Sequence, residues 1–559
     1  MLASLLSLLL VLVCVLLAKQ SRGADVAAVE RLERLGSLRY VPLALATINA
    51  LLVWWMLGFE LSPVPQIQDE AAYLLQAGIF ARGRWTEMAR PLPEFFAQMH
   101  VFTTPVLASK YPPGTSLFLT PFVWIGFPAL APMVLAGFTG AFIFVLARRV
   151  GNATIAALAW VIWTTAPWAL RWQATFLSQT VTVTLWLAAL YFLLKYRDEQ
   201  RPWSLIALAA TVGCCAITRP VTAVALAVPV GVVVMRDFWR TRAWRSLTAA
   251  ALTGAVIVGI LPLQNWMTTG DWRVSPLVNY SREYLPSDFP GFGFDSSQPV
   301  APLPSDLERS RQELFEARRQ HTLEALPQTL VHRWARSLTI VAYGWRVGLA
   351  PLILLGALVM PAAGILAFGM SIGLLVAYAF HSHWPQWSQY YLEAAPGYAF
   401  ALAAGIWGLA SWVIRGWPTV RRRTLWDGAE PRVAVAAVVT TVALGIPGLL
   451  RIPTTVSRYQ SEVAYQRRFG QALRLVRKEP HKTIVFVDYG PNHNAHFSLV
   501  RNVPNLTDAR TWIVYERGRD DLRLMRLAPE RRAYIYHADD GRLTRLPPLA
   551  ELERIVAAR

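Results

Sequence analysis

The sequence is poor in charged residues and in cysteine. Of its 559 residues, 16% are charged, against about a quarter in an average soluble domain. Its three cysteines, Cys14, Cys214 and Cys215, lie inside apolar runs, which excludes a disulfide framework of the kind found in small secreted domains. With 54% apolar residues, the composition is the reverse of a disordered chain. The chain is also too long for one soluble core, which rarely grows beyond roughly 250–300 residues.

Acidic residues are scarcer than basic ones. There are 35 acids and 54 bases, which leaves a net charge of +19. Such basicity is typical either of nucleic-acid-binding proteins or of membrane proteins whose basic residues gather on one side. The distribution of the basic residues decides between these two classes.

Apolar runs near the ~20 residues that cross a bilayer recur along the first 450 positions. We expect about twelve membrane helices, near residues 2–18, 41–60, 129–147, 153–170, 176–194, 204–218, 220–235, 246–266, 348–361, 363–380, 395–414 and 432–450. Basic residues follow the first run and none precedes it. This order favours a retained helix with its N-terminus outside over a cleaved signal peptide.

Basic residues concentrate in alternate connections between these runs. Nineteen of them lie in segments 19–40, 148–149, 195–201, 236–245 and 415–432. The short connections between those segments hold only Arg171 and Arg219. By the positive-inside rule the basic segments are cytoplasmic. The excess of basic residues therefore indicates how the chain is oriented in the membrane, and no nucleic-acid partner is expected.

This orientation predicts a membrane domain over residues 1–450 with large outer segments at 61–128 and 267–347. Residues 451–559 form the third outer piece, with 20 bases against 12 acids. Strand-like patterns at 483–489, 511–515 and 532–537, together with a basic-faced helix at 457–478, predict a small α/β domain there. The expected fold is a polytopic α-helical membrane protein that carries a C-terminal α/β domain outside the membrane.

A pair of adjacent acids stands just beyond the second predicted span. Asp69 and Glu70 enter a helical pattern that brings Tyr73 onto the same face. An isolated pair of this kind is most simply an N-cap and a first-turn acid. The rest of the loop is what favours a functional role.

Further along the loop, Lys110 stands beside a rigid turn, Tyr111-Pro112-Pro113-Gly114. Two prolines cannot lie in a helix interior, so the chain is extended here. The apolar stretch 115–126 is too short to span comfortably and is typical of an interfacial or re-entrant segment. The loop thus combines an acid pair, a fixed cation and a surface helix.

Several motifs in this arrangement carry a family resemblance. They are Asp69-Glu70-x-x-Tyr73, Lys110-Tyr111-Pro112-Pro113-Gly114, Thr218-Arg219-Pro220, Asn265-x-x-x-Thr269-Gly270, Pro290-Gly291-Phe292-Gly293 and the segment 388–396. Together they resemble the GT-C superfamily of membrane glycosyltransferases, most of all the bacterial branch related to protein O-mannosyltransferases and lipid A aminoarabinose transferases. The resemblance covers about residues 40–420, and Gln389 stands where that family usually has arginine.

The resemblance implies transfer of a sugar from a polyprenyl-phosphate carrier to an acceptor hydroxyl, with inversion at the anomeric carbon, no metal and no other cofactor. Asp69 is then the base that accepts the acceptor's proton, and Glu70 orients the acceptor or the surroundings of Asp69. Lys110 and Arg219 are the expected cations at the lipid phosphate. The other expected donor contacts are Tyr111, Gln389, Tyr390 and Tyr391.

Some candidates have simpler alternatives. Arg219 interrupts an apolar stretch, which marks a functional residue by default, but such an arginine can also extend toward the membrane interface. Tyr73, His381 and His383 are weaker candidates for acceptor or pocket contacts. His381 and His383 do not share a helical face, so interfacial histidines are favoured over metal ligands.

The expected partners are a polyprenyl-phosphate-linked sugar, a glycan, lipid or protein acceptor, and the lipids of the bacterial cytoplasmic membrane. Two other classes suit a multi-span chain: a lipid or polysaccharide transporter or flippase, and a surface-polysaccharide ligase or polymerase. Transporters usually show repeats and polar residues near the midplane. Here ionisable residues cluster at span ends and in loops, which favours an enzyme over a transporter.

Overall fold

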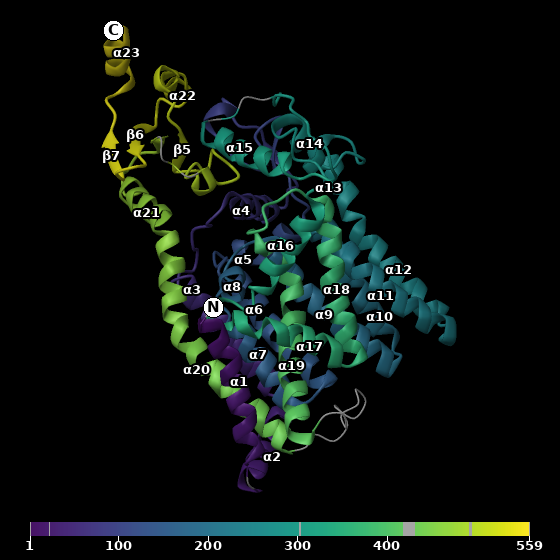
Figure 1. Ribbon diagram of the computed structural model, residues 1–559. Coiled ribbons are helices and arrows are strands. Elements are labelled where there is room, and N and C mark those ends of the chain that lie inside the picture. The colour runs from purple at the N-terminus through teal and green to yellow at the C-terminus, as the bar shows by residue number, and fades with distance from the viewer. Residues whose placement is uncertain are drawn as a thin grey trace. The chain divides into compact units, whose positions relative to one another are not determined.

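The computed structural model describes residues 2–21, 23–300, 303, 305–416, 431–490, 493 and 495–557 (Figure 1). Arg22 and Arg421–Arg423, four of the basic residues used to predict orientation, lie outside these residues. The chain forms two compact units. Unit 1 comprises Met1–Glu60, Ala129–Gly259 and Leu323–Tyr459, and unit 2 comprises Leu61–Pro128, Ile260–Thr322 and Gln460–Arg559. Three sequence segments that we expect outside the membrane therefore contribute to unit 2.

Unit 1 is built from helices. They are α1 (Leu2–Lys19), α2 (Gly23–Ser37), α3 (Val41–Met56), α6 (Leu130–Val150), α7 (Ala153–Thr164), α8 (Pro167–Gln173), α9 (Ser178–Glu199), α10 (Pro202–Thr218), α11 (Pro220–Thr241), α12 (Trp244–Val258), α16 (Leu326–Leu338), α17 (Ala350–Val359), α18 (Ala362–Ala377), α19 (Ala395–Arg415) and α20 (Pro431–Glu462), with 3-10 helices η2 (Gly344–Leu349), η3 (Tyr378–Phe380) and η4 (Ser388–Ala394).

Every apolar run predicted from the sequence lies in a helix or a helix pair. Among the described residues, six helices are long and apolar enough to cross a membrane, or up to eight if each of two bent pairs is one span. The other predicted runs lie in α1, α9, α10 and α17. Membrane-protein character is clear, whereas the predicted number of about twelve spans exceeds what length and composition establish.

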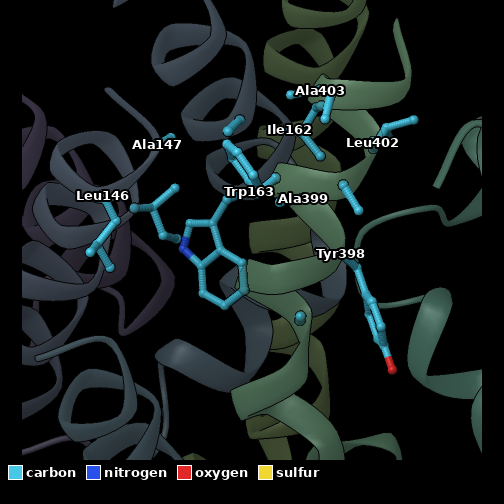
Figure 2. Packing of buried hydrophobic residues seen from close by; sticks show 14 of the residues in the cluster. Leu146, Ala147, Ile162, Trp163, Tyr398, Ala399, Leu402 and Ala403 are labelled. Atoms are coloured by element: carbon cyan, nitrogen blue, oxygen red, sulfur yellow. The ribbon is translucent and has the colours of Figure 1, made fainter. Parts of the chain in front are cut away.

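The core of unit 1 lies where α6, α7 and α19 meet. Trp163 of α7 is fully buried, and Figure 2 shows its indole among Leu146 and Ala147 on one side and the α19 residues near Ala399 on the other. Small residues allow close packing elsewhere: a Cβ added at Gly356 of α17 would stand 1.7 Å from the Ala401 carbonyl oxygen of α19. Close backbone approach through glycine is typical of packed membrane helices.

Unit 2 mixes helices and strands. Its elements are α4 (Gln68–Phe80), β1 (Glu87–Met88), η1 (Pro93–Phe95), β2 (Val101–Phe102), β3 (Val106–Ser109), α5 (Gly114–Trp124), α13 (Ile260–Thr269), α14 (Pro276–Tyr284), α15 (Ser305–Arg319), α21 (Ala464–Val476), β4 (Thr483–Asp488), η5 (Ala495–Phe497), β5 (Thr511–Tyr515), η6 (Gly518–Asp520), α22 (Asp521–Leu527), β6 (Arg532–His537), β7 (Arg542–Arg545) and α23 (Leu549–Ala557).

The C-terminal sheet has strand order β5-β4-β6-β7, with β4 parallel to both neighbours and β7 antiparallel to β6. Strands β4, β5 and β6 lie where the sequence patterns predict them. The helix predicted over 457–478 is instead two helices, because Val463 leaves the helical region with φ −93° and ψ 2°. The predicted domain boundary at residue 450 falls inside α20, which runs to Glu462.

The two faces of this sheet have different partners. Alternate residues of a strand point to opposite faces, so Val485 and Val487 pack against α21. Ile484 and Phe486 pack against a cluster that includes Phe95 from the segment Leu61–Pro128. The core of the C-terminal sheet is therefore completed by a residue nearly 400 positions earlier in the chain.

Candidate functional site

The acid pair begins helix α4. Ile67 occupies the N-cap position with extended backbone and no capping side chain, so Asp69 and Glu70 are first-turn acids. Carboxylates are favoured there because unpaired backbone N–H groups concentrate at a helix N-terminus. Further on, the Gln76 side chain accepts from the Ser109 backbone N–H and donates to the Trp85 carbonyl, which ties α4 to the neighbouring strands.

Asp69 is only partly enclosed. Its side chain is 35% exposed; Oδ1 accepts a hydrogen bond of 2.5 Å from the Tyr111 hydroxyl, and Oδ2 lies 3.7 Å from Nε2 of His100. Burial raises the pKa of Asp69, but His100, the Tyr111 hydroxyl and the Lys110 ammonium together hold the pKa below its usual range. Asp69 is therefore an ionised carboxylate that solvent or a substrate can reach.

A short antiparallel pair of strands brings His100 beside Lys110. Val101 of β2 pairs with Ser109 of β3, and the Lys110 N–H donates to the His100 carbonyl at 2.9 Å. His100 adopts φ +66°, a region that non-glycine residues occupy sparingly and often at functional sites. Burial, with Lys110 next, lowers the pKa of His100 to about 3, so its imidazole is neutral at physiological pH.

Lys110 is a buried cation with defined partners. It is 3% exposed, and its Nζ lies 3.4 Å from Oδ2 of Asp288. The ammonium also stands over the rings of Tyr111 and Tyr280, at 5.5 and 5.1 Å from their centroids, a geometry that stabilises a cation. The fixed cation predicted from the sequence is thus held beside Asp69, and Tyr73 packs its ring 4.7 Å from that of Tyr111.

Glu70 has surroundings different from those of Asp69. It is 2% exposed, and its carboxylate interacts electrostatically with Arg501 of the C-terminal segment. Arg501 donates to the Pro65 carbonyl at 2.7 Å, and Gln466 donates to the Gln66 carbonyl at 3.2 Å. Burial lowers the pKa of Arg501 to about 10 while Glu70 opposes that shift, so Arg501 remains cationic at neutral pH.

A second C-terminal side chain approaches the same site. His496 Nε2 lies 2.9 Å from Oε2 of Glu313 on α15, and His496 interacts electrostatically with Asp69. The hydrogen bond that His496 donates to Glu313 raises the pKa of His496. All three segments of unit 2 therefore contribute charged groups around Asp69.

Arg219 belongs to a separate cluster in unit 1. It is 8% exposed and forms an ion pair of 3.3 Å with Glu393, which is fully buried. Arg219 also donates to the Tyr378 hydroxyl at 2.5 Å, and Thr182 donates to Glu393. A buried, paired guanidinium differs from an arginine that extends to the membrane interface.

The segment that resembles a family motif lies next to this ion pair. Arg219 stands 5.5 Å from the Tyr390 ring centroid, and the Tyr391 hydroxyl lies 2.9 Å from Nε2 of His383. Arg333 donates to the carbonyls of His381 and His383. The Gln389 side chain has a buried oxygen without a hydrogen-bond partner.

The predicted residues thus fall into two groups, one in each unit. Unit 2 holds Asp69, Glu70, Tyr73, Lys110 and Tyr111, and unit 1 holds Arg219, His381, His383, Gln389, Tyr390 and Tyr391. Sequence reasoning did not single out His100, Tyr280, Asp288 or Arg501 as site residues, and the last three lie in segments of unit 2 far along the chain from Asp69. The strand patterns that place His100 opposite Lys110 are a signal that was available in the sequence.

Residues 111–266 match the family model described as dolichyl-phosphate-mannose-protein mannosyltransferase. No match is found among the curated proteins.

Several solved structures match this chain at low sequence identity. ArnT from Cupriavidus metallidurans bound to undecaprenyl phosphate is 15% identical, with a TM-score of 0.48, over 89% of this chain and 94% of that chain. Arabinosyltransferase EmbB from Mycobacterium smegmatis is 12% identical, with a TM-score of 0.43, over 82% of this chain and 44% of that chain. The Archaeoglobus fulgidus oligosaccharyltransferase is 12% identical, with a TM-score of 0.39, over 84% and 65%.

The match over residues 111–266 begins within the Lys110-to-Gly114 motif and includes Arg219. Over these residues it confirms the predicted resemblance to the protein O-mannosyltransferases.

Proposed function

We propose that this protein transfers a sugar from a polyprenyl-phosphate carrier to an acceptor hydroxyl at the outer face of the bacterial cytoplasmic membrane. The family whose model matches residues 111–266 is named for a donor of that class, a dolichyl-phosphate-linked sugar. The acceptor is a glycan, a lipid or a protein. The geometry of Asp69 is the observation that carries the proposal.

Asp69 has the properties that a general base needs. One oxygen is anchored by Tyr111, and the carboxylate remains ionised and partly exposed. As the acceptor oxygen bonds to the anomeric carbon, its proton moves to Asp69. The bond from that carbon to the phosphate oxygen breaks, and the polyprenyl phosphate leaves with the electron pair. A single displacement of this kind inverts the anomeric centre.

The leaving phosphate needs a cation to stabilise its developing charge. Lys110 is preorganised for this role because Asp288 and two aromatic rings hold it within electrostatic range of Asp69. Arg219 is the second proposed phosphate contact. Since Arg219 is already paired with Glu393, a phosphate would join or displace that ion pair. Gln389, Tyr390 and Tyr391 remain proposed donor contacts, and His381 and His383 remain proposed acceptor or pocket contacts.

The test is a transfer assay with purified protein. Polyprenyl-phosphate sugars are incubated with the protein and candidate acceptors, and release of polyprenyl phosphate is followed. We expect Asp69→Asn to lower turnover by roughly 10²- to 10⁴-fold, the usual contribution of a general base.

Asp508→Asn is the matched control, because Asp508 is an exposed acid of the same unit, 57% exposed and paired with Arg82. It should retain the wild-type rate. Full turnover by Asp69→Asn would remove Asp69 from the chemistry.

A further inference from the structure

The acid pair at the start of α4 has two unlike environments. Asp69 is partly exposed and interacts electrostatically with Lys110, whereas Glu70 is buried and interacts electrostatically with Arg501. Active sites often use neighbouring carboxyl groups in different roles by giving them different surroundings. Here Arg501 of the C-terminal segment, 431 positions beyond Glu70 in the chain, contributes to the second environment.

We propose that Arg501 is a positioning residue for the catalytic turn, and that the C-terminal segment is in this way a working part of the active site. This inference rests on the proposed function of Asp69.

The hydrogen bonds of the C-terminal segment support this role. Arg501 and Gln466 donate to two consecutive backbone carbonyls, those of Pro65 and Gln66. These carbonyls lie directly before α4, so the contacts fix where the helix starts. Because Asp69 is in the first turn, a shift of this segment moves the base itself.

Charge also links Arg501 to the acid pair. The buried Glu70 carboxylate is among the groups that interact electrostatically with Arg501. The other titratable groups that face Arg501 are Tyr489 and Tyr515. Those that face Asp69 are His100, Lys110, Tyr111 and His496. Arg501 thus belongs to the electrostatic surroundings of the buried Glu70, whereas Asp69 remains partly exposed.

Two readouts test the proposal, the first without catalysis. Arg501→Gln removes the hydrogen bond from the guanidinium to the Pro65 carbonyl, so the backbone amides at the start of α4 should exchange with solvent faster than in wild type. Hydrogen exchange followed by mass spectrometry measures this. Wild-type protection of these amides in Arg501→Gln would contradict the proposal.

The second readout is transfer kinetics. We expect Arg501→Gln to lower kcat by roughly ten- to a hundredfold, the scale of a misplaced catalytic group, with KM for the donor within about twofold because Lys110 is untouched. Arg501→Lys should recover much of the rate because it keeps the charge. Arg519→Gln, an exposed arginine of the same segment, is the control and should behave as wild type.

The outcomes separate the two proposals. If wild-type protein transfers no sugar, the proposed function fails. If wild type is active and Asp69→Asn is not, but Arg501→Gln keeps the wild-type kcat, the positioning role is wrong. An effect on stability alone would likewise reduce Arg501 to a structural residue and overturn the inference.

Discussion

At the scale of single residues, the site is defined by which charges are paired and which are left accessible. Lys110 and Arg219 are both buried cations that the sequence singled out. Each has a carboxylate partner in the structure, Asp288 at 3.4 Å and Glu393 at 3.3 Å. Glu393 is fully buried, whereas the Asp288 side chain is 21% exposed. Lys110 therefore has the weaker internal partner and is the better placed to bind a substrate anion.

This difference leads to a prediction for Lys110. Lys110→Met should weaken binding of a polyprenyl phosphate by roughly ten- to a hundredfold, the value of one charge-assisted hydrogen bond. Binding of the lipid phosphate to detergent-solubilised protein measures this directly.

Asp288→Asn supplies the opposite test. It removes the competing anion and leaves the cation, so the affinity should be equal or higher than in wild type. Equal losses in both variants would show that the ion pair, and not the lysine charge, matters for binding.

His100 gives a pH prediction. Its pKa is lowered to about 3 in the folded protein, against an ordinary value near 6.5. Between these values the unfolded chain binds more protons than the folded one, so stability falls as pH drops from about 6.5 toward 3. The thermal unfolding midpoint should fall less between pH 7 and pH 4.5 in His100→Asn, because this variant has no imidazole to protonate. Asparagine is chosen because it tolerates positive φ.

The control for this prediction is His481→Asn. His481 is exposed at the start of the C-terminal sheet, and its replacement should leave the acid sensitivity unchanged. An identical midpoint loss in wild type and His100→Asn would contradict the role assigned to His100.

At the scale of elements, unit 2 is one structure in which segments far apart in the sequence pack together, and not a series of separate modules. Phe95 of η1 is fully buried against one face of the C-terminal sheet, and Phe96 makes an edge contact with Trp512 at 5.7 Å. Arg90 donates to the carbonyls of Val503 and Pro504. The predicted catalytic loop and the predicted C-terminal domain thus share a hydrophobic core.

Phe95→Ala should destabilise the C-terminal sheet, although Phe95 is not a residue of that sheet. Removing a buried phenylalanine costs about 3–5 kcal/mol, so the amides of β4 and β5 should exchange with solvent on the order of a hundredfold faster or more. Hydrogen exchange followed by mass spectrometry measures this. Leu527→Ala is the control: this residue is 52% exposed, and its replacement should change the exchange rates little. Unaltered protection in Phe95→Ala would mean that the sheet folds without the segment that contains Phe95.

At the scale of the whole molecule, the distribution of basic residues predicts that unit 2 faces outward. In a background without the three native cysteines, Arg519→Cys should react with a membrane-impermeant thiol reagent in intact cells, and Gln200→Cys should react only after lysis. Both positions are exposed in the structure. The reverse pattern would invert the orientation and with it the proposed location of the chemistry.

Local features of the protein followed from its sequence. Apolar runs became helices, and β4, β5 and β6 lie where alternating and β-branched residues predicted them, because both depend on residues near one another in the chain. Asp69, Lys110 and Tyr111 were identified from short motifs. That these residues lie close together was expected only from the family resemblance. In the structure, the β2–β3 pair and α4 bring them together.

What the tertiary structure alone decided is which distant segments meet. The partner of Lys110 lies 178 positions away and that of Arg219 lies 174 positions away. Arg501 reaches Pro65 across 436 positions. Hydropathy and spacing describe how each segment folds, but they carry no information on which of several basic residues will be buried against one acid. That choice depends on how complete units pack. The composition therefore indicated a membrane protein, whereas only the tertiary structure showed which residues surround Asp69 and Glu70.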